Sequence, residues 1–250
     1  MLPPAPNPAN LPRPVPLDAL SGILLIDKPS GPTSHDIVDH IRRRFRLPKV
    51  GHGGTLDPQA TGLLVILIGK ATKLPDRFMS SDKTYAGCLR LGIATDSQDA
   101  QGAVIREADP SAVTRALVEE AMARFRGDIM QTPPMVSAVK KDGVPLYKLA
   151  RKGQSVERAA RLIHVYDFHL TRFDPPLAGF EMRCTKGTYV RTICHELGDA
   201  LGCGAHLAEL RRTECAGFHI EDACTLTDVL ALDVGQLRER IIPMSRVFIR

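Results

Sequence analysis

The chain has 250 residues, of which 44% are hydrophobic and 24% charged, and its formal net charge is +5. This length and composition are typical of a soluble globular protein that buries a core in one large domain or two small ones. The longest apolar run is far shorter than the roughly 20 residues that span a bilayer, and the N-terminus lacks the basic start and apolar centre of a secretion signal, so we expect a cytoplasmic protein without membrane contact.

The N-terminal residues predict no regular structure. Residues 1–20 hold seven of the nineteen prolines and almost no periodic apolar pattern, which indicates a disordered or extended leader. Folded structure should begin with a strand over residues 23–26. Thr33 with Asp36 then forms a capping signal, and apolar residues at helical spacing predict a helix over about residues 34–46. Its inward stripe consists of Ile37, Ile41 and Phe45.

A glycine-rich segment with a single carboxylate, residues 51–62, leads directly into the apolar run 63–68. Pro58 biases Asp57 towards extended backbone, and the glycines allow the chain to turn tightly around a bound group. The pattern predicts a loop at the edge of a buried strand, with Asp57 as a candidate nucleophile. Ordinary turn chemistry also explains an Asp-Pro pair between glycines, so at this point both interpretations stay open.

Strands and helices are mixed in the next part of the chain. Residues 84–91 predict a half-buried strand with Tyr85 on its inward face, and residues 180–185 predict another. Asp109-Pro110 should open a helix that ends at Gly127. The inward residues of this helix, four apart, are Val113, Leu117, Ala121 and Phe125.

Two further helices are expected towards the C-terminus, one over residues 190–201 and a last one capped by Thr225 with Asp228. The order of elements shows neither an internal repeat nor the strict alternation of a parallel wound fold. We therefore predict an α+β (mixed α/β) fold in which helices flank a mixed sheet.

Basic residues are concentrated in two segments. Residues 131–161 carry seven basic and two acidic residues and few large apolar ones, which predicts an inserted arm. Its basic residues include Lys140, Lys141, Lys148, Arg151 and Lys152. A second group at the end of the first predicted helix comprises Arg42, Arg43, Arg44, Arg46 and Lys49. Such clusters favour a polyanionic partner, although a solvated helix face has the same local pattern.

The sequence indicates neither a cofactor nor a metal. Leu56 stands where a dinucleotide fingerprint needs glycine, and Ala71 stands where a phosphate loop needs Ser or Thr. The six cysteines form no Cys-x-x-Cys pair, which disfavours a disulfide framework and a zinc ribbon, and we expect them to be buried thiols. His195, Cys203 and His206 lie close in sequence but lack a fourth ligand at helical or hairpin spacing.

Four separated motifs together resemble the TruB family of tRNA pseudouridine synthases. They are Lys28 to Ser34, Gly51 to Gly62, Gln131 to Arg151 and Lys186 to Thr192. The resemblance spans about residues 21–243 and is specific because of the order and spacing of the motifs. It implies the pseudouridine synthase fold, with a mixed, largely antiparallel sheet flanked by helices and an arm that grips RNA. The implied activity is isomerisation of the uridine at position 55 in the T-loop of elongator tRNAs, without cofactor or metal.

The resemblance also implies roles for individual residues. Asp57 matches the catalytic aspartate of the family, and Arg191 matches the arginine that is paired with it. Tyr85 matches the tyrosine that stacks on the target base, and His52 the histidine that helps to keep the nucleotide flipped out. Three further residues correspond to the substrate pocket: Lys28, Tyr189 and Leu210. The T-arm of tRNA is the implied partner, and no obligate protein partner is expected.

The chain also departs from the family pattern. Gly53 stands where the family often has threonine, which should loosen the loop. Many relatives continue into a small C-terminal RNA-binding domain of the PUA type, whereas residues 244–250 are expected to form only a short tail without it. Two rival functions stay open: a pseudouridine synthase acting on another RNA, and an RNA-folding chaperone for which catalysis is dispensable.

Overall fold

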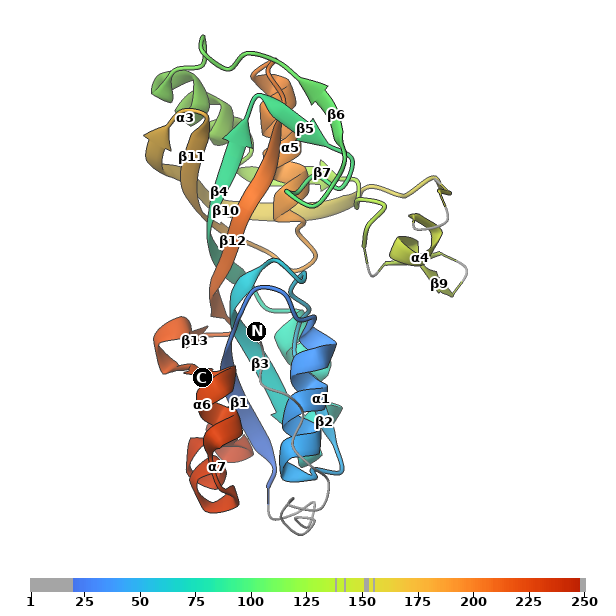
Figure 1. Cartoon of the computed structure of the whole chain (residues 1–250), viewed down its shortest axis with the longest axis vertical. Coiled ribbons are helices and arrows are strands. Elements are labelled where there is room, and N and C mark those ends of the chain that lie inside the picture. Colours follow the sequence, from blue (N-terminus) through green and yellow to red (C-terminus); the bar gives the residue numbers. More distant parts are fainter. Residues whose placement is uncertain (1–19, 138, 142, 151–152, 155, 248–250) are drawn as a thin grey trace. The chain divides into compact units, whose positions relative to one another are not determined.

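The computed structural model describes residues 20–247 apart from 138, 142, 151–152 and 155 (Figure 1). Except for Leu20, which is buried, the predicted leader lies outside the described residues. The described chain forms two compact units. Unit 1 contains the described residues up to Lys83 and those from Arg211 onward, and unit 2 contains Thr84–Leu210.

A mixed sheet forms the centre of unit 1. Its strands are β1 (Gly22–Lys28), β2 (Val50–His52), β3 (Thr61–Ile68), the end of β12 (Ala205–Cys215), β13 (Phe218–His219), β14 (Cys224–Thr225) and β15 (Ile242–Pro243). Strands β14, β1, β3 and β12 follow one another, with β15 beside β1, β2 beside β3 and β13 beside β12. The β1–β14 and β3–β12 pairs are parallel, and the other pairs are antiparallel. This arrangement confirms the predicted mixed, largely antiparallel sheet.

Helices flank the sheet of unit 1. They are α1 (Ser34–Phe45), η2 (Gly69–Lys73), α2 (Pro75–Met79), η3 (Ile220–Asp222), α6 (Leu226–Ala231), α7 (Val234–Arg240) and α8 (Met244–Val247). Figure 1 shows α1 and α6 running alongside β1. A core cluster joins β1 and β3 to α2 and β13 through the buried residues Ile23, Leu25, Leu63, Val65, Leu67, Phe78 and Phe218. The apolar run 63–68 is therefore a buried strand, as predicted.

Helix α1 forms where the sequence predicts it. Thr33 and Asp36 make a complete capping box, and the predicted inward residues Ile37, Ile41 and Phe45 are buried. The basic group at its end is partly structural, because Arg44 donates from Nε and Nη2 to two carbonyl oxygens at the end of α6. These are the oxygens of Leu230 and Leu232, both at 2.8 Å.

The prediction that the helix after Thr225 is the last one is wrong. Thr225 does cap α6, but α7 follows after a short turn. Asp233 accepts a hydrogen bond from the Gln236 N–H at 2.8 Å, and the Gln236 side chain accepts one from the Asp233 N–H at 3.0 Å. This reciprocal capping satisfies two backbone donors, so the chain begins a new helix instead of remaining extended.

Unit 2 contains the second group of strands and helices. Its strands are the beginning of β12, β4 (Lys83–Leu91), β5 (Ile93–Thr95), β6 (Val104–Glu107), β7 (Gly127–Gln131), β8 (Lys140–Lys141), β9 (Val144–Pro145), β10 (Arg161–Asp174) and β11 (Leu177–Cys184), and its helices are α3 (Arg115–Arg124), α4 (Leu146–Ala150) and α5 (Val190–Ala200). The sheet order is β12, β4, β11, β10 and β7, while β5–β6 and β8–β9 are separate hairpins.

The predicted strands of unit 2 are confirmed. Strand β4 buries Tyr85, and β11 alternates as predicted between buried Phe180, Met182 and Cys184 and exposed Glu181 and Arg183. Gln131, at the end of β7, pairs with Arg161, at the start of β10. The segment between them is therefore an insertion between neighbouring strands, and Figure 1 shows it carrying α4 and β9.

Helix α3 begins later than predicted, and its buried face only partly matches the predicted one. The Asp109 carboxylate accepts hydrogen bonds from the Ser111 N–H and hydroxyl, so the Asp-Pro segment forms a turn. Thr114 caps the helix instead. Of the predicted inward residues, Val113 and Ala121 are buried and Leu117 is 46% exposed, while Val118 and Met122 are buried in addition. A strict spacing of four drifts around a helix with 3.6 residues per turn, which explains the exposed Leu117.

Gly198 allows α5 to approach the start of β12 at backbone contact distance. A Cβ atom on Gly198 would lie 2.1 Å from the Ala205 nitrogen and 2.4 Å from the Gly204 carbonyl carbon. Both neighbours are backbone atoms, so the helix would have to move to accommodate a methyl group.

We predict that Gly198→Ala lowers the free energy of unfolding by about 1 to 3 kcal/mol, because overpacking a tight contact strains the backbone. Urea unfolding followed by circular dichroism measures this change. The control is Gly235→Ala in α7, where the added methyl group meets only the exposed Asp233 carboxylate, at 3.2 Å. The control should be neutral or stabilising, since alanine favours helix by about 1 kcal/mol. Equal stability of Gly198→Ala and wild type would contradict the close approach.

Candidate active site

Asp57 lies in a short loop of unit 1, residues 53–60, which we call the aspartate loop. Asp57 is exposed, whereas the flanking residues Leu56 and Ala60 are each 4% exposed. The Gly53 N–H donates to the Val65 carbonyl of β3 at 2.8 Å, and the Ala60 N–H donates to the Asp57 carbonyl at 3.1 Å. The first hydrogen bond anchors the loop to β3, and the second closes a turn within the loop, which leaves Asp57 exposed.

Lys28 holds the C-terminal part of this loop from the end of β1. Its side chain is fully buried, and its ammonium donates to the carbonyl oxygens of Pro29 at 2.9 Å, Pro58 at 3.0 Å and Ala60 at 2.7 Å. Burial lowers the pKa of Lys28 from 10.5 to about 8; the Asp57 carboxylate opposes this shift, and Arg212 adds to it. Lys28 was predicted as a pocket residue, and the structure shows that it supports the backbone around Asp57.

Two side chains that sequence reasoning missed hold the N-terminal part of the loop. Ser34 is buried in the first turn of α1, where its hydroxyl accepts from the Leu56 N–H at 2.8 Å and donates to the Leu56 carbonyl at 3.1 Å. Arg212 in β12 is 1% exposed. Its guanidinium donates to the carbonyl oxygens of Leu63 at 2.8 Å, Gly54 at 3.2 Å and Thr55 at 3.4 Å. Ser34 belongs to a recognised motif, whereas Arg212 follows Leu210 in a strand that the sequence analysis did not examine.

His52 and Gly53 join the aspartate loop to β2. The Gly54 N–H donates to Nδ1 of His52 at 3.4 Å. Burial, followed by the charges of Arg212 and His35, lowers the pKa of His52, which favours the neutral imidazole. A Cβ on Gly53 would lie 2.5 Å from Cβ of Phe78. Gly53 therefore permits close packing against α2, which corrects the expectation that it loosens the loop.

The other predicted pocket residues lie in unit 2. Tyr85 is on β4 and only 8% exposed, Tyr189 and Arg191 are at the start of α5, and Leu210 is in β12. Arg191 is 3% exposed, and its guanidinium carbon lies 5.7 Å from the centre of the Tyr189 ring. Tyr189 and Arg191 thus come together in unit 2, as Lys28, His52 and Asp57 do in unit 1. The pairing of Arg191 with Asp57 stays a prediction.

Asp99 is a further residue that the sequence analysis missed. One of its carboxylate oxygens accepts from the Ser97 hydroxyl at 2.6 Å and from the Gln101 N–H at 3.0 Å. The other lies 3.6 Å from Nη1 of Arg191, while Nη2 of Arg191 donates to the Val136 carbonyl at 2.5 Å. Asp99 therefore fixes the buried guanidinium in orientation. The only local signal was the short polar turn in which Asp99 lies.

The start of the arm is tied to α5 by Gln131. Its buried side-chain amide donates to the Tyr189 carbonyl at 3.0 Å and accepts from the Tyr189 N–H at 2.8 Å. Among the arm residues predicted to bind RNA, Lys140 and Lys141 lie in β8 and Lys148 is exposed on α4. Arg151 and Lys152 lie outside the described residues.

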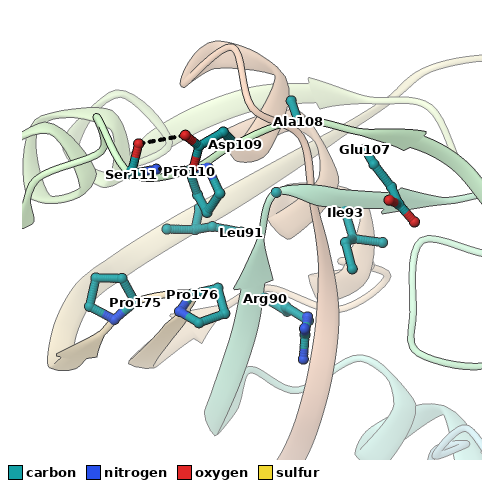
Figure 2. A pocket seen from close by; sticks show the side chains of 11 residues that line it. Arg90, Leu91, Ile93, Glu107, Ala108, Asp109, Pro110, Ser111, Pro175 and Pro176 are labelled. Atoms are coloured by element: carbon teal, nitrogen blue, oxygen red, sulfur yellow. Dashed lines mark hydrogen bonds between the residues drawn. The ribbon is translucent and has the colours of Figure 1, made fainter.

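A hollow of about 690 Å³ lies elsewhere in unit 2, at the end of β4 (Figure 2). It is lined by residues of three segments, including Arg90, Glu107, Asp109 and Pro176. Figure 2 shows the hydrogen bond between the Ser111 hydroxyl and the Asp109 carboxylate, two of the lining residues. Because none of the predicted site residues lines it, this hollow is not part of the candidate active site.

The described residues contain no group of three or more His, Cys, Asp and Glu side chains that could hold a metal ion. His206 instead contacts the Ile93 carbonyl through Nδ1 at 2.9 Å, and the Cys203 thiol donates to the Gly204 carbonyl at 3.3 Å. All six cysteines are free thiols, but Cys88 and Cys224 are partly exposed, which corrects the expectation that all are buried.

We predict that Lys28 makes folding stability rise with pH between about 8 and 10.5. The unfolded chain keeps this lysine protonated up to about pH 10.5, whereas the folded protein releases the proton near pH 8. In that interval the unfolded state binds more protons, so the free energy of unfolding increases, by about 3 kcal/mol at most. Chemical unfolding of the wild type and of Lys28→Met at several pH values measures the contribution of Lys28 to the free energy of unfolding. The exposed Lys49→Met should show no such difference from wild type, and a flat difference for Lys28→Met would contradict the lowered pKa.

Comparisons with known proteins identify the family to which this chain belongs. A TruB family pseudouridylate synthase N-terminal domain matches residues 42–190, and a tRNA pseudouridylate synthase B C-terminal domain matches residues 191–248. The tRNA pseudouridine synthase B of Opitutus terrae is 54% identical over 229 residues, which cover 92% of this chain and 95% of the relative. That of Syntrophotalea carbinolica is 50% identical over 207 residues, covering 83% and 68%.

A solved structure of a Cbf5-Nop10-Gar1 complex contains a chain that is 30% identical, with a TM-score of 0.72. The alignment covers 93% of this chain and 64% of that chain. A structure of an H/ACA RNP bound to a substrate RNA matches with a TM-score of 0.68 at 27% identity, over 90% and 60% of the two chains. The N-terminal domain match spans more than half of the residues and the relatives are closely similar, so this chain belongs to the TruB family of pseudouridylate synthases.

Proposed function

We propose that the protein is a tRNA pseudouridine-55 synthase, which isomerises the T-loop uridine of elongator tRNAs with Asp57 as its catalytic residue. The observation that carries the proposal is the exposed Asp57 carboxylate on a loop whose backbone is fixed by buried Lys28, Ser34 and Arg212. Family membership and relatives named tRNA pseudouridine synthase B support the substrate.

The reaction explains the need for a well-placed carboxylate. The bond between ribose C1′ and uracil N1 must break, the freed base must turn, and C1′ must join C5, where a proton is finally lost. Asp57 can support the electron-poor ribose by covalent attack or by its charge, as carboxylates do in glycoside cleavage. It can also take part in elimination of a ribose proton. The rigid loop limits the motion of the carboxylate in either route.

The target base must leave the folded T-loop before it reacts. Extrusion costs a few kcal/mol, and stacking on an aromatic ring can offset roughly 1 to 3 kcal/mol of that cost. We assign the stacking to Tyr85 and the stabilisation of the flipped nucleotide to His52. Arg191, oriented by Asp99, is assigned to the Asp57 carboxylate, and Tyr189 and Leu210 complete the pocket.

The basic arm is assigned to the phosphates of the T-arm. Lys148 is exposed on α4, and the arm is held to α5 through the Gln131–Tyr189 hydrogen bonds, so binding of the T-arm is coupled to the pocket. The proposed location is the cytoplasm, where tRNA is available. Every helix in the described part of the chain is too short or too polar to cross a membrane.

We predict that Asp57→Asn abolishes isomerisation while tRNA affinity stays within about threefold of wild type, because the carboxylate acts in the chemistry rather than in docking. Release of tritium from a tRNA transcript labelled at uridine C5 measures the reaction, and filter binding measures affinity. Asp222→Asn, at an exposed aspartate of unit 1, is the matched control and should remain active. Turnover by Asp57→Asn would remove this residue from the mechanism.

The same assay tests the rival functions. Tritium release that survives replacement of the T-loop uridine by cytidine would place the target elsewhere in RNA. Tight binding without any release by the wild type, together with accelerated tRNA refolding, would favour the chaperone.

We predict that the double variant Lys140→Gln, Lys141→Gln weakens tRNA binding and flattens its salt dependence. Each lost phosphate contact should reduce the slope of log K against log salt concentration by about 0.7 to 0.9. Titrations between low and moderate salt measure this slope. The control removes two charges from α3, Arg115 and Arg124, each of which is paired with a glutamate on the same helix. If both double variants have the wild-type slope, the arm does not contact phosphates.

A further inference from the structure

Arg211 and Arg212 are adjacent in β12 but differ in solvent exposure and in hydrogen-bond partners. Arg211 is partly exposed and makes a two-pronged ion pair with Asp27, with Nη1 at 2.9 Å and Nη2 at 2.6 Å from the two carboxylate oxygens. Arg212 is 1% exposed, and among the described residues its hydrogen-bond partners are three backbone carbonyls. A buried cation that is bonded to main chain instead of to a carboxylate is costly, which indicates a specific role.

The three carbonyls lie on both sides of Asp57. Gly54 and Thr55 precede it in the aspartate loop, and Leu63 follows it in β3. One planar guanidinium therefore joins the two limbs of the loop, with Nε on Leu63 and the two terminal nitrogens on Gly54 and Thr55.

The backbone of β12 reinforces this clamp. Arg211 and Arg212 pair in parallel with Thr61 and Gly62 at the start of β3. Gly62 has a φ of 96°, and a Cβ there would lie 2.3 Å from the Arg212 carbonyl oxygen. Strand β12 therefore lies in close backbone contact with Gly62, just after the aspartate loop. This contact limits the motion of the Arg212 side chain.

We propose that Arg212 is a positioning residue of the active site, whose guanidinium sets the backbone conformation that presents Asp57 to the substrate. This inference rests on the proposed function of Asp57. It requires the fork of arginine as well as the charge, because a lysine ammonium at this place cannot reach Leu63, Gly54 and Thr55 with the same geometry. Arg212 bonds to the backbone on both sides of Asp57, and Lys28 bonds to the limb that follows it, so two buried cations hold the loop that carries the carboxylate.

The test compares Arg212→Lys and Arg212→Met with the matched variants Arg211→Lys and Arg211→Met. We expect Arg212→Lys to remain folded, to bind tRNA within about threefold of wild type, and to lose about 10- to 100-fold in the single-turnover rate of tritium release, as small misplacements of catalytic groups do. The Arg211 variants should keep the wild-type rate within about threefold. Thermal unfolding of each variant gives the folded fraction at the assay temperature.

A pH profile separates positioning from a merely structural role. The charged groups that act on Lys28 are Asp57, Arg212 and Asp36, and Arg212 disfavours its protonated form. We expect the wild-type rate to decline above about pH 8 as Lys28 loses its proton, and the decline to move to higher pH in Arg212→Met and to stay in place in Arg211→Met. An unshifted or absent decline would overturn the action of Arg212 on this site.

The outcomes distinguish this inference from the proposed function. An inactive wild type would remove the proposed function itself. With an active wild type, a wild-type rate for Arg212→Lys would overturn the positioning role alone. The positioning role would also be overturned if the loss of rate in the Arg212 variants matched their loss of folded protein. It would be overturned too if the Arg211 variants lost as much activity as the Arg212 variants.

Discussion

The hydrogen bonds between two buried cations and the backbone of the aspartate loop are the interaction on which the proposed active site depends. A catalytic carboxylate has to be accessible to RNA, and Asp57 is exposed, yet exposed loops are the most mobile parts of a protein. Lys28 and Arg212 are buried beneath the loop surface and hold its backbone by hydrogen bonds. They bind the carbonyls on either side of Asp57, so the loop backbone is held in place while the Asp57 side chain stays exposed.

This arrangement also sets the electrostatics of the site. Burial is the main cause that lowers the pKa of Lys28 to about 8; the Asp57 carboxylate opposes this shift, and the Arg212 charge adds to it. Burial, followed by the charges of Arg212 and His35, also lowers the pKa of His52, which favours its neutral ring. Polarity is therefore concentrated in a few fully bonded groups, while the flanking residues Leu56 and Ala60 are buried and apolar.

Unit 2 fixes its own functional residues in a comparable way. Arg191 is buried and meets Asp99 and the Val136 carbonyl, and the backbone of Tyr189 is held by the side chain of Gln131. Gln131 is also the last residue of β7, from which the basic arm departs. The hydrogen bonds that hold the Tyr189 backbone therefore also anchor the start of the arm.

The sequence alone determined the features that depend on neighbouring residues. The Thr33–Asp36 capping box started α1, the alternation of residues 180–185 gave a half-buried strand, and the glycine-rich motif identified Asp57 as the candidate catalytic group. It placed α3 too early, because the Asp109 turn competed with the cap at Thr114. Only the tertiary structure decided the roles of Arg212, Asp99 and Gln131. Each of them contacts a residue 58 to 158 positions away in the chain. Contacts between such distant residues leave no periodic or local pattern in the sequence.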